Sequence, residues 1–300
     1  MPRQSKGKRP VSPINFRLNT KLRVKRSAAS YVYKPLESET SIRILELQPG
    51  EDYEPIHCKL SIVDQNKARQ YEALSYTWGR SIDTRVISCS GKKLNIPVHL
   101  RDALLNLRHT SKVKYFWADA ICIDQSNTQE RGHQVKIMGS IFAGAERVLV
   151  WLGGVDHFEY FEDKENSLTA LAFKFLKLTS EEPAFLEIDP DFRLDEFDDD
   201  LHYFLTSIAK LTHRPYFSRL WVLQEVGLGK SVVALLGNTE IDFVLLLKIF
   251  ATLSSSSILS MCFGIQERAI LPFSFFPTLN KAVFNSDSDE ELDFLDILLL

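Results

Sequence analysis

The sequence predicts an α/β fold in which helices cover both faces of a parallel sheet, and three consecutive segments of residues 116–153 support this prediction. Residues 116–125 form a short apolar run interrupted by acids, which indicates a buried strand. Residues 148–152 form a second apolar run, closed by a glycine pair. Between them, apolar residues recur at the spacing of one helix face: Val135, Met138, Ile141, Phe142 and Ala145. A strand, a helix and a strand with short connections make a βαβ unit, whose strands run parallel.

The other elements follow from the same periodicities. Strands are expected where polar and apolar residues alternate or where short apolar runs occur, at residues 41–47, 56–63, 71–78, 85–90, 93–96 and 232–236. Turn-forming residues join the first two of these segments, and Ser90-Gly91-Lys92 joins the fourth and fifth, so two N-terminal β-hairpins are predicted. Helices are expected after Pro97, with Leu100, Ala103, Leu104 and Leu107 on one face, and at residues 201–211, 216–225 and 241–253. Ser218 is the expected N-cap of the helix near 216–225.

Shifts in composition divide the chain into three parts. Residues 1–36 carry many basic side chains and no acid, which indicates a disordered tail. Residues 37–255 form the main domain, with core motifs at 71–237 and an acidic, partly helical insertion at about 157–200. Residues 256–300 form a C-terminal segment that ends inside an apolar run without a cap, so we expect that the chain was truncated there.

The composition also bears on location. No apolar stretch is long enough to cross a bilayer, and the N-terminus lacks the apolar core of a secretory signal, so we expect a cytoplasmic protein without membrane contact. The four cysteines form no CxxC pair and suit reduced thiols. The favoured interpretation of the basic tail is a solvated extension. Nuclear import, a nucleic-acid patch and a mitochondrial presequence stay open as alternatives, although nucleic acid is not an expected partner.

Several common kinds of site are missing from the sequence. GxGxxG and GxxxxGK[ST] motifs are absent, which argues against a dinucleotide-dependent dehydrogenase or a nucleotide hydrolase. The histidines show no paired ligand spacing, so no metal site and no required cofactor are expected. Cys122 and His133 could form a nucleophile and a base, but their spacing does not enforce contact, and a buried inert thiol is the favoured interpretation.

Polar residues interrupt the predicted strands at Ser75, Asp119 and Asp124. A buried carboxylate is costly unless it is paired, so Asp119 is expected to accept hydrogen bonds from backbone N–H groups or from an arginine. Asp124 is predicted at the carboxyl end of a strand, where binding a ligand and capping the following helix are equally supported.

Glu225 is the carboxylate with the strongest claim to chemistry. It lies one helical turn from Trp221 on a mostly apolar segment, so partial desolvation would suit it to acid, base or ion-stabilising work. The alternative is a structural salt bridge to Arg214 or Arg219, and without further argument that alternative is favoured.

Five ordered motifs resemble the heterokaryon-incompatibility (HET) domain of filamentous fungi. They are YEALSYTWG at residues 71–79, three motifs within FWADAICIDQSNTQERGHQVKIMGSIFAGAERVLVWLG at 116–153, and RPYFSRLWVLQEV at 214–226. The sequence departs from the family pattern in having Phe142 where tyrosine is usual and Tyr216 where tryptophan is usual. The family's basic and aromatic block after a leucine-rich helix is also missing, which strengthens the expectation of truncation.

The resemblance implies a role in fungal non-self recognition, in which the domain triggers programmed cell death after unlike hyphae fuse. The family is also similar to TIR domains of innate immunity, which implies a flavodoxin/TIR-like core. Some TIR domains hydrolyse NAD with a glutamate in a motif that SRLWVLQEV resembles. By this analogy Glu225 is the predicted catalytic residue, NAD a candidate substrate, and the expected pocket wall consists of Ser75, Trp78, Asp124 and Trp221.

Two hypotheses about mechanism stay open at this point. The first is an enzyme that cleaves NAD. The second is a non-enzymatic module that acts by self-association or by binding other incompatibility or NLR-type proteins, and it is motivated by the aromatic and apolar groups of residues 216–222, which are expected to be exposed.

Overall fold

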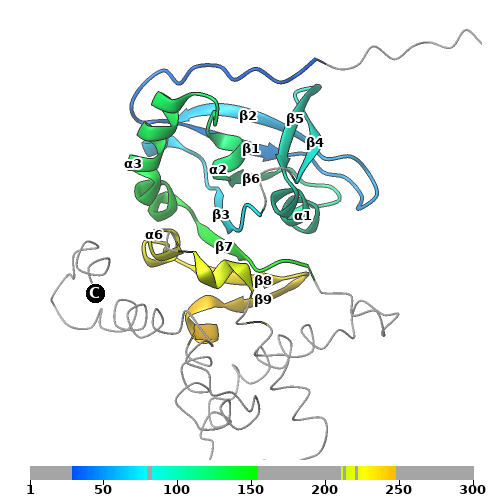
Figure 1. The fold of residues 1–300 in the computed structure, drawn as a ribbon, viewed down its shortest axis with the longest axis vertical. Helices are drawn as coiled ribbons and strands as arrows, with labels where there is room; N and C mark the ends of the chain where they lie inside the picture. The colour runs from blue at the N-terminus through cyan, green and yellow to red at the C-terminus, as the bar shows by residue number, and fades with distance from the viewer. Residues whose placement is uncertain (1–28, 80–82, 155–210, 212–213, 220–221, 248–300) are drawn as a thin grey trace, which may run out of the picture.

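The computed structural model describes residues 29–79, 83–154, 211, 214–219 and 222–247 (Figure 1). The acidic insertion, the predicted helix at 201–211 except its last residue, and the C-terminal segment lie outside the described residues, as do residues 1–28 of the basic tail.

The described strands form one mixed sheet of nine strands in the order β5-β4-β2-β1-β6-β3-β7-β8-β9. Their bounds are β1 Ser41–Leu47, β2 His57–Asp64, β3 Glu72–Tyr76, β4 Thr84–Cys89, β5 Lys92–Pro97, β6 Lys114–Trp117, β7 Arg147–Trp151, β8 Val232–Leu236 and β9 Thr239–Asp242. The described helices are α1 Val98–Leu107, α2 Asp119–Cys122, α3 Thr128–Gly144 and α6 Val222–Gly227, with short 3₁₀ turns η1 Gln65–Lys67 and η5 Pro215–Ser218.

The predicted parallel arrangement of strands is confirmed at the centre of the sheet. Strands β6, β3, β7 and β8 run parallel to one another. On the flanks the pairs β1–β2, β1–β6, β4–β5 and β8–β9 are antiparallel and hold most of the registered residues, whereas β2 and β4 share a short parallel contact. For β1–β2, β4–β5 and β8–β9 the physical reason is the short connection within each hairpin, since such a connection can join antiparallel strands but not parallel ones.

The predicted βαβ unit is present, but another strand lies inside it. β6 and β7 are joined through α2 and α3, and β3 is hydrogen-bonded between them. In Figure 1, α3 and α6 lie to the left of these central strands and α1 lies to their right. Both predicted hairpins are confirmed, and the turn between β4 and β5 places Ser90 and Gly91 at φ 50° and 77°.

Two helices show where periodicity succeeds and where it fails. The predicted buried face of α1 is confirmed at all four positions. In α3, Met138, Ile141 and Phe142 are buried as predicted, but Val135 is 39% exposed. Gln134 is fully buried in its place, because its amide donates a 3.0 Å hydrogen bond to the Ser41 carbonyl at the start of β1.

Three predicted boundaries were wrong. Residues 119–122 form the helical turn α2 rather than the end of a strand, and the backbone N–H of Cys122 donates to the carbonyl of Ala118 at 2.7 Å. The predicted continuous helix at 216–225 is a 3₁₀ turn and a separate helix, because Arg219 has extended backbone at φ −89° and ψ 131°. Ser218 therefore ends η5 and is not the N-cap of a helix.

The third boundary error concerns residues 241–253. Ile241 and Asp242 belong to β9, because a tight turn at Gly237 returns the chain along β8. Helical residues begin at Phe243, where the Asp242 carboxylate accepts a 2.9 Å hydrogen bond from the N–H of Leu245.

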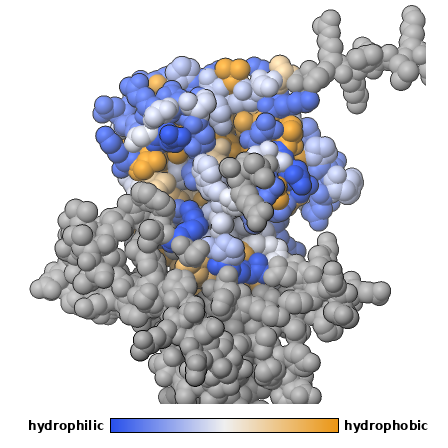
Figure 2. Space-filling model, in the orientation of Figure 1, coloured by the Kyte–Doolittle hydropathy of each residue, from blue (hydrophilic) through white to orange (hydrophobic). Residues whose placement is uncertain are grey.

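The core is one continuous apolar cluster that runs along the sheet under its helices. Figure 2 shows a mostly hydrophilic face over the described strands and helices, with small separate apolar patches. Within the described part of the chain, no helix has both the length and the apolar character needed to span a membrane.

Candidate functional site

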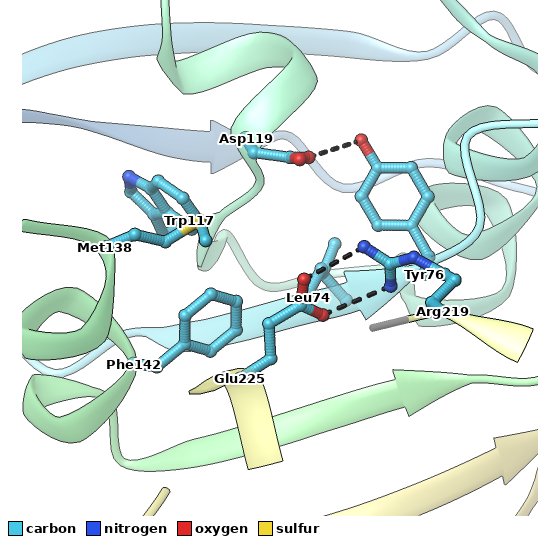
Figure 3. A pocket seen from close by; sticks show the side chains of 8 residues that line it. All are labelled: Leu74, Tyr76, Trp117, Asp119, Met138, Phe142, Arg219 and Glu225. Atoms are coloured by element: carbon cyan, nitrogen blue, oxygen red, sulfur yellow. Dashed lines mark hydrogen bonds and ion pairs between the residues drawn. The ribbon is translucent and has the colours of Figure 1, made fainter. Parts of the chain in front are cut away.

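A small pocket lies at the carboxyl ends of the parallel strands β3 and β6, under α3 and α6 (Figure 3). Its lining combines apolar and charged side chains, namely Leu74, Tyr76, Trp117, Asp119, Met138, Phe142, Arg219 and Glu225. In open α/β sheets, ligands bind outside the carboxyl ends of the strands, so this is where a ligand site is expected. In the described arrangement the lining side chains pack so closely that they leave no room for a water molecule. Ligand pockets usually measure roughly 300–1,000 Å³.

Glu225 projects from α6 into this pocket and is 4% exposed. Arg219 holds both of its carboxylate oxygens, with Nη2–Oε1 and Nη1–Oε2 distances of 2.9 and 3.2 Å. The salt-bridge alternative is therefore present, and Arg219 is the partner. Arg214 instead donates a 2.8 Å hydrogen bond to the carbonyl of Leu152.

Ser75 is the second group that binds the Glu225 carboxylate. The hydroxyl of this buried residue donates to Oε2 of Glu225 and lies 2.6 Å from the hydroxyl of Tyr216. Because the Ser75 proton is engaged by the carboxylate, Tyr216 is left to donate to Ser75. Burial raises the pKa of Tyr216, and the nearby Glu225 charge acts in the same direction, so this phenol stays protonated and able to donate.

Asp119 forms the opposite wall, directly after β6. It accepts hydrogen bonds from the Tyr76 hydroxyl at 2.9 Å, the Trp78 indole at 2.8 Å and the backbone N–H of Ala120 at 2.7 Å. The expected backbone donor is confirmed, but the other donors are aromatic side chains rather than an arginine. Burial raises the pKa of this carboxyl from 3.8 to about 6, and the negative charge of Glu225 adds to the shift. The pocket thus holds two carboxylates, and the charge of Glu225 disfavours ionisation of Asp119.

The raised pKa of Asp119 gives a testable pH dependence. Because its pKa lies above that of the unfolded chain, folding takes up a proton between about pH 4 and 6, and stability from this group falls as pH rises through that window. The expected loss is on the order of 1–3 kcal/mol. In a ¹³C NMR titration, Glu225→Gln should lower the pKa of Asp119. The surface variant Asp102→Asn should leave it unchanged, and an unchanged value in Glu225→Gln would contradict the coupling.

The predicted site residues are brought together only in part. Only Glu225 lines the pocket itself. Ser75 is linked to it through the hydrogen bond to Glu225, and Trp78, which is 40% exposed, through the hydrogen bond to Asp119. Asp124 is not among the lining residues, and its carboxylate instead accepts from the N–H and hydroxyl of Ser126 in the turn before α3. Trp221 lies outside the described residues.

The sequence interpretation assigned only Glu225 among the lining residues to the site. It missed Leu74, Tyr76, Trp117, Asp119, Met138, Phe142 and Arg219 as pocket residues. Phe142 packs edge-to-face on Trp117, with ring centroids 5.5 Å apart, and closes the apolar side of the pocket. Tyr76 and Arg219 belong to the motifs that define the resemblance, so charge and hydrogen-bonding capacity inside those motifs were the available signal. No group of metal-ligating side chains is assembled among the residues that the structure describes.

The five motifs, four of which supply the residues that line this pocket, define a HET-domain protein with a mixed α/β sheet. Residues 71–225, more than half of the chain, match the family described as heterokaryon incompatibility protein (HET), and the chain belongs to that family. It is 29% identical over 222 residues to heterokaryon incompatibility protein 6, OR allele, of Neurospora crassa. The aligned part covers 63% of this chain and 32% of that protein, so the chain spans about a third of its relative. Comparison with solved structures gives no match.

Proposed function

We propose that this protein acts in fungal heterokaryon incompatibility, and that the pocket around Glu225 cleaves NAD to trigger cell death. The first part of the proposal rests on the family and on the name of the Neurospora relative. The second part rests on one observation, which is a buried carboxylate in an aromatic-lined pocket at the carboxyl ends of parallel strands.

The order of the parallel strands supports the choice of this pocket. Taken by their sequence order, β6, β3, β7 and β8 lie as second, first, third and fourth strand. Flavodoxin-like sheets have this arrangement, and they bind their ligands at the carboxyl edge. A flavodoxin/TIR-like core is therefore part of the proposal.

Cleavage of NAD would require Glu225 to stabilise positive charge. Cleavage of the nicotinamide–ribose bond passes through an oxocarbenium-like state, and a carboxylate held in a site with little water stabilises such charge strongly. Arg219 neutralises Glu225 in the described arrangement, so substrate binding must displace the guanidinium. Displacement would also enlarge the pocket, which is smaller than typical ligand sites.

A non-enzymatic signalling module is the second candidate, and a specific observation favours it. Both Glu225 oxygens are bound by Arg219, and the Ser75 hydroxyl completes the set, as expected of a structural ion pair. The exposed aromatic surface that was expected at residues 216–222 gives this candidate less support, because Tyr216 and Phe217 are only 1% and 7% exposed. Self-association, or binding to other incompatibility proteins, would then carry the signal.

Expression in a naive fungal host separates the two candidates. Wild type, Glu225→Gln and Glu225→Ala are induced while viability and cellular NAD are followed together. If the pocket is catalytic, the wild type kills and depletes NAD, and Glu225→Gln does neither while its thermal unfolding stays cooperative. The exposed variant Glu240→Gln is the matched control and should behave as wild type.

Other outcomes of the same experiment are equally decisive. Death with NAD untouched in both wild type and Glu225→Gln removes the enzyme and supports the interaction module. A wild type that neither kills nor consumes NAD, alone or when purified with the dinucleotide, contradicts both candidates for this chain.

A further inference from the structure

Two cysteines far from the pocket occupy directly paired positions on neighbouring strands. Cys58 of β2 and Cys89 of β4 are registered partners in the parallel pair, and both side chains are buried, at 2% and 0% exposure. Registered partners on adjacent strands project to the same face of a sheet, with strand axes about 4.7–4.9 Å apart. A disulfide needs Cα atoms about 4.4–6.8 Å apart, so the backbone already meets its main requirement.

We propose that Cys58 and Cys89 form a redox site that closes to a disulfide under hydrogen peroxide. This inference does not depend on the proposed NAD cleavage, because the thiols share no residue with the pocket.

The hydrogen bonds around the two thiols differ, and this difference assigns each thiol a role in the reaction. A hydrogen bond from Cys58 lowers the pKa of Cys89, and bonds from Tyr31 and Ser90 act in the same direction. The same thiol–thiol bond and burial raise the pKa of Cys58. Because Cys89 receives the hydrogen bonds from Tyr31 and Ser90 in addition to the one from Cys58, it takes the part of the attacking thiolate and Cys58 that of the resolving thiol.

The chemistry balances with peroxide as the oxidant. The Cys89 thiolate attacks one peroxide oxygen, the O–O bond breaks, and Cys89 becomes a sulfenic acid while hydroxide leaves. The sulfur of Cys58 then attacks the Cys89 sulfur, and the sulfenic hydroxyl leaves as water. Two thiols are oxidised, one peroxide is reduced, and two waters are formed in all.

The residues before β1 cover the thiol pair. The N–H of Tyr31 donates to the carbonyl of Lys93 at 2.7 Å, and the N–H of Lys93 donates to the carbonyl of Ala29 at 2.9 Å, which binds this segment along β5. The Tyr31 hydroxyl reaches Cys89 from there. Its ring packs edge-to-face on Tyr33 at 5.2 Å, so the cover is itself anchored.

The disulfide would reinforce the short contact between β2 and β4. β2 and β4 share two registered pairs, His57 with Ser88 and Cys58 with Cys89. Backbone bonds from the N–H of Ser88 and of Ser90 extend this contact at 3.0 and 2.9 Å. Through this contact the β4–β5 hairpin is joined to the centre of the described sheet. A disulfide here would tie the hairpin to β2 covalently.

The test uses the full chain, reduced and then titrated with hydrogen peroxide. Remaining thiols are alkylated, and peptides are mapped by mass spectrometry. The expected result is a Cys58–Cys89 linked peptide that dithiothreitol removes. Closing this loop should raise the melting temperature by roughly 5–10 °C. Cys122→Ala is the matched control, since Cys122 is also buried and should leave the link intact.

Single variants test the assigned order of attack. In Cys58→Ser, Cys89 should stop at the sulfenic acid, which dimedone traps, and no link should form. In Cys89→Ser, neither the link nor the dimedone adduct should appear. The proposal is overturned if both wild-type thiols stay alkylatable at peroxide levels that oxidise free cysteine, if Cys89 passes to sulfinic acid unlinked, or if either cysteine links elsewhere.

Discussion

Arg43→Ala should lower the free energy of unfolding by about 3–5 kcal/mol, because it leaves a buried carboxylate without its partner. The Arg43 and Glu130 side chains are 1% and 8% exposed, and the guanidinium holds both carboxylate oxygens at 2.5 and 3.0 Å. It also donates to the carbonyls of Cys122 and Lys34 at 3.0 and 2.6 Å. One side chain on β1 therefore anchors α2, α3 and the segment before β1, and urea unfolding measures its loss.

Two further variants separate this effect from a general loss of charge. Arg101→Ala removes an ion pair whose side chains are 41% and 46% exposed, so it should cost less than about 1 kcal/mol. The double variant Arg43→Met with Glu130→Met should be more stable than either single variant, because no charge is left buried alone. A double variant less stable than both singles would contradict this account.

Arg219→Ala should have an effect of similar size at neutral pH, about 3–5 kcal/mol, because Glu225 would then be a buried charge without a counterion. The Arg219 guanidinium also lies 5.7 Å from the centre of the Tyr216 ring, so packing is lost as well. Urea unfolding at pH 7 measures this loss.

The comparison with Arg219→Lys defines the geometry of the interaction. Lysine keeps the charge but cannot hold two carboxylate oxygens side by side, so part of the loss should remain. If Arg219→Ala is as stable as wild type at pH 7, the ion pair is not structural, and the case for a mobile, catalytic arrangement becomes stronger. The result therefore also bears on the proposed function.

Local patterns predicted most of the elements correctly, because burial imposes its period on neighbouring residues. Both hairpins, the buried face of α1 and strand β8 came from alternation or helical spacing within about ten residues. The pairing of distant strands leaves no such signal. The insertion of β3 between β6 and β7, and the antiparallel pairing of β1 with β6, are set by contacts between segments far apart in the chain.

Polar residues at unusual positions were the harder problem. The alternation of residues 41–47 suggested a strand with one polar face, yet Arg43 is buried because a carboxylate and two carbonyls meet it. In the candidate site, the motif resemblance predicted that Ser75 and Glu225 belong to one pocket. It did not predict the helix break at Arg219, because the extended backbone of that residue is stabilised by a side-chain contact that forms only in the folded chain.

The central position of β3 has a consequence for how the chain is made. Its neighbours in the sheet, β6 and β7, both come later in the sequence, so neither edge can be paired when β3 leaves the ribosome. Ala73 and Leu74, which are fully buried in the finished sheet, stay uncovered until Arg147–Trp151 has been synthesised. The order of synthesis and the order of pairing thus differ, and assembly of the sheet centre is a late event that leaves an apolar strand open to chaperones or to aggregation in the meantime.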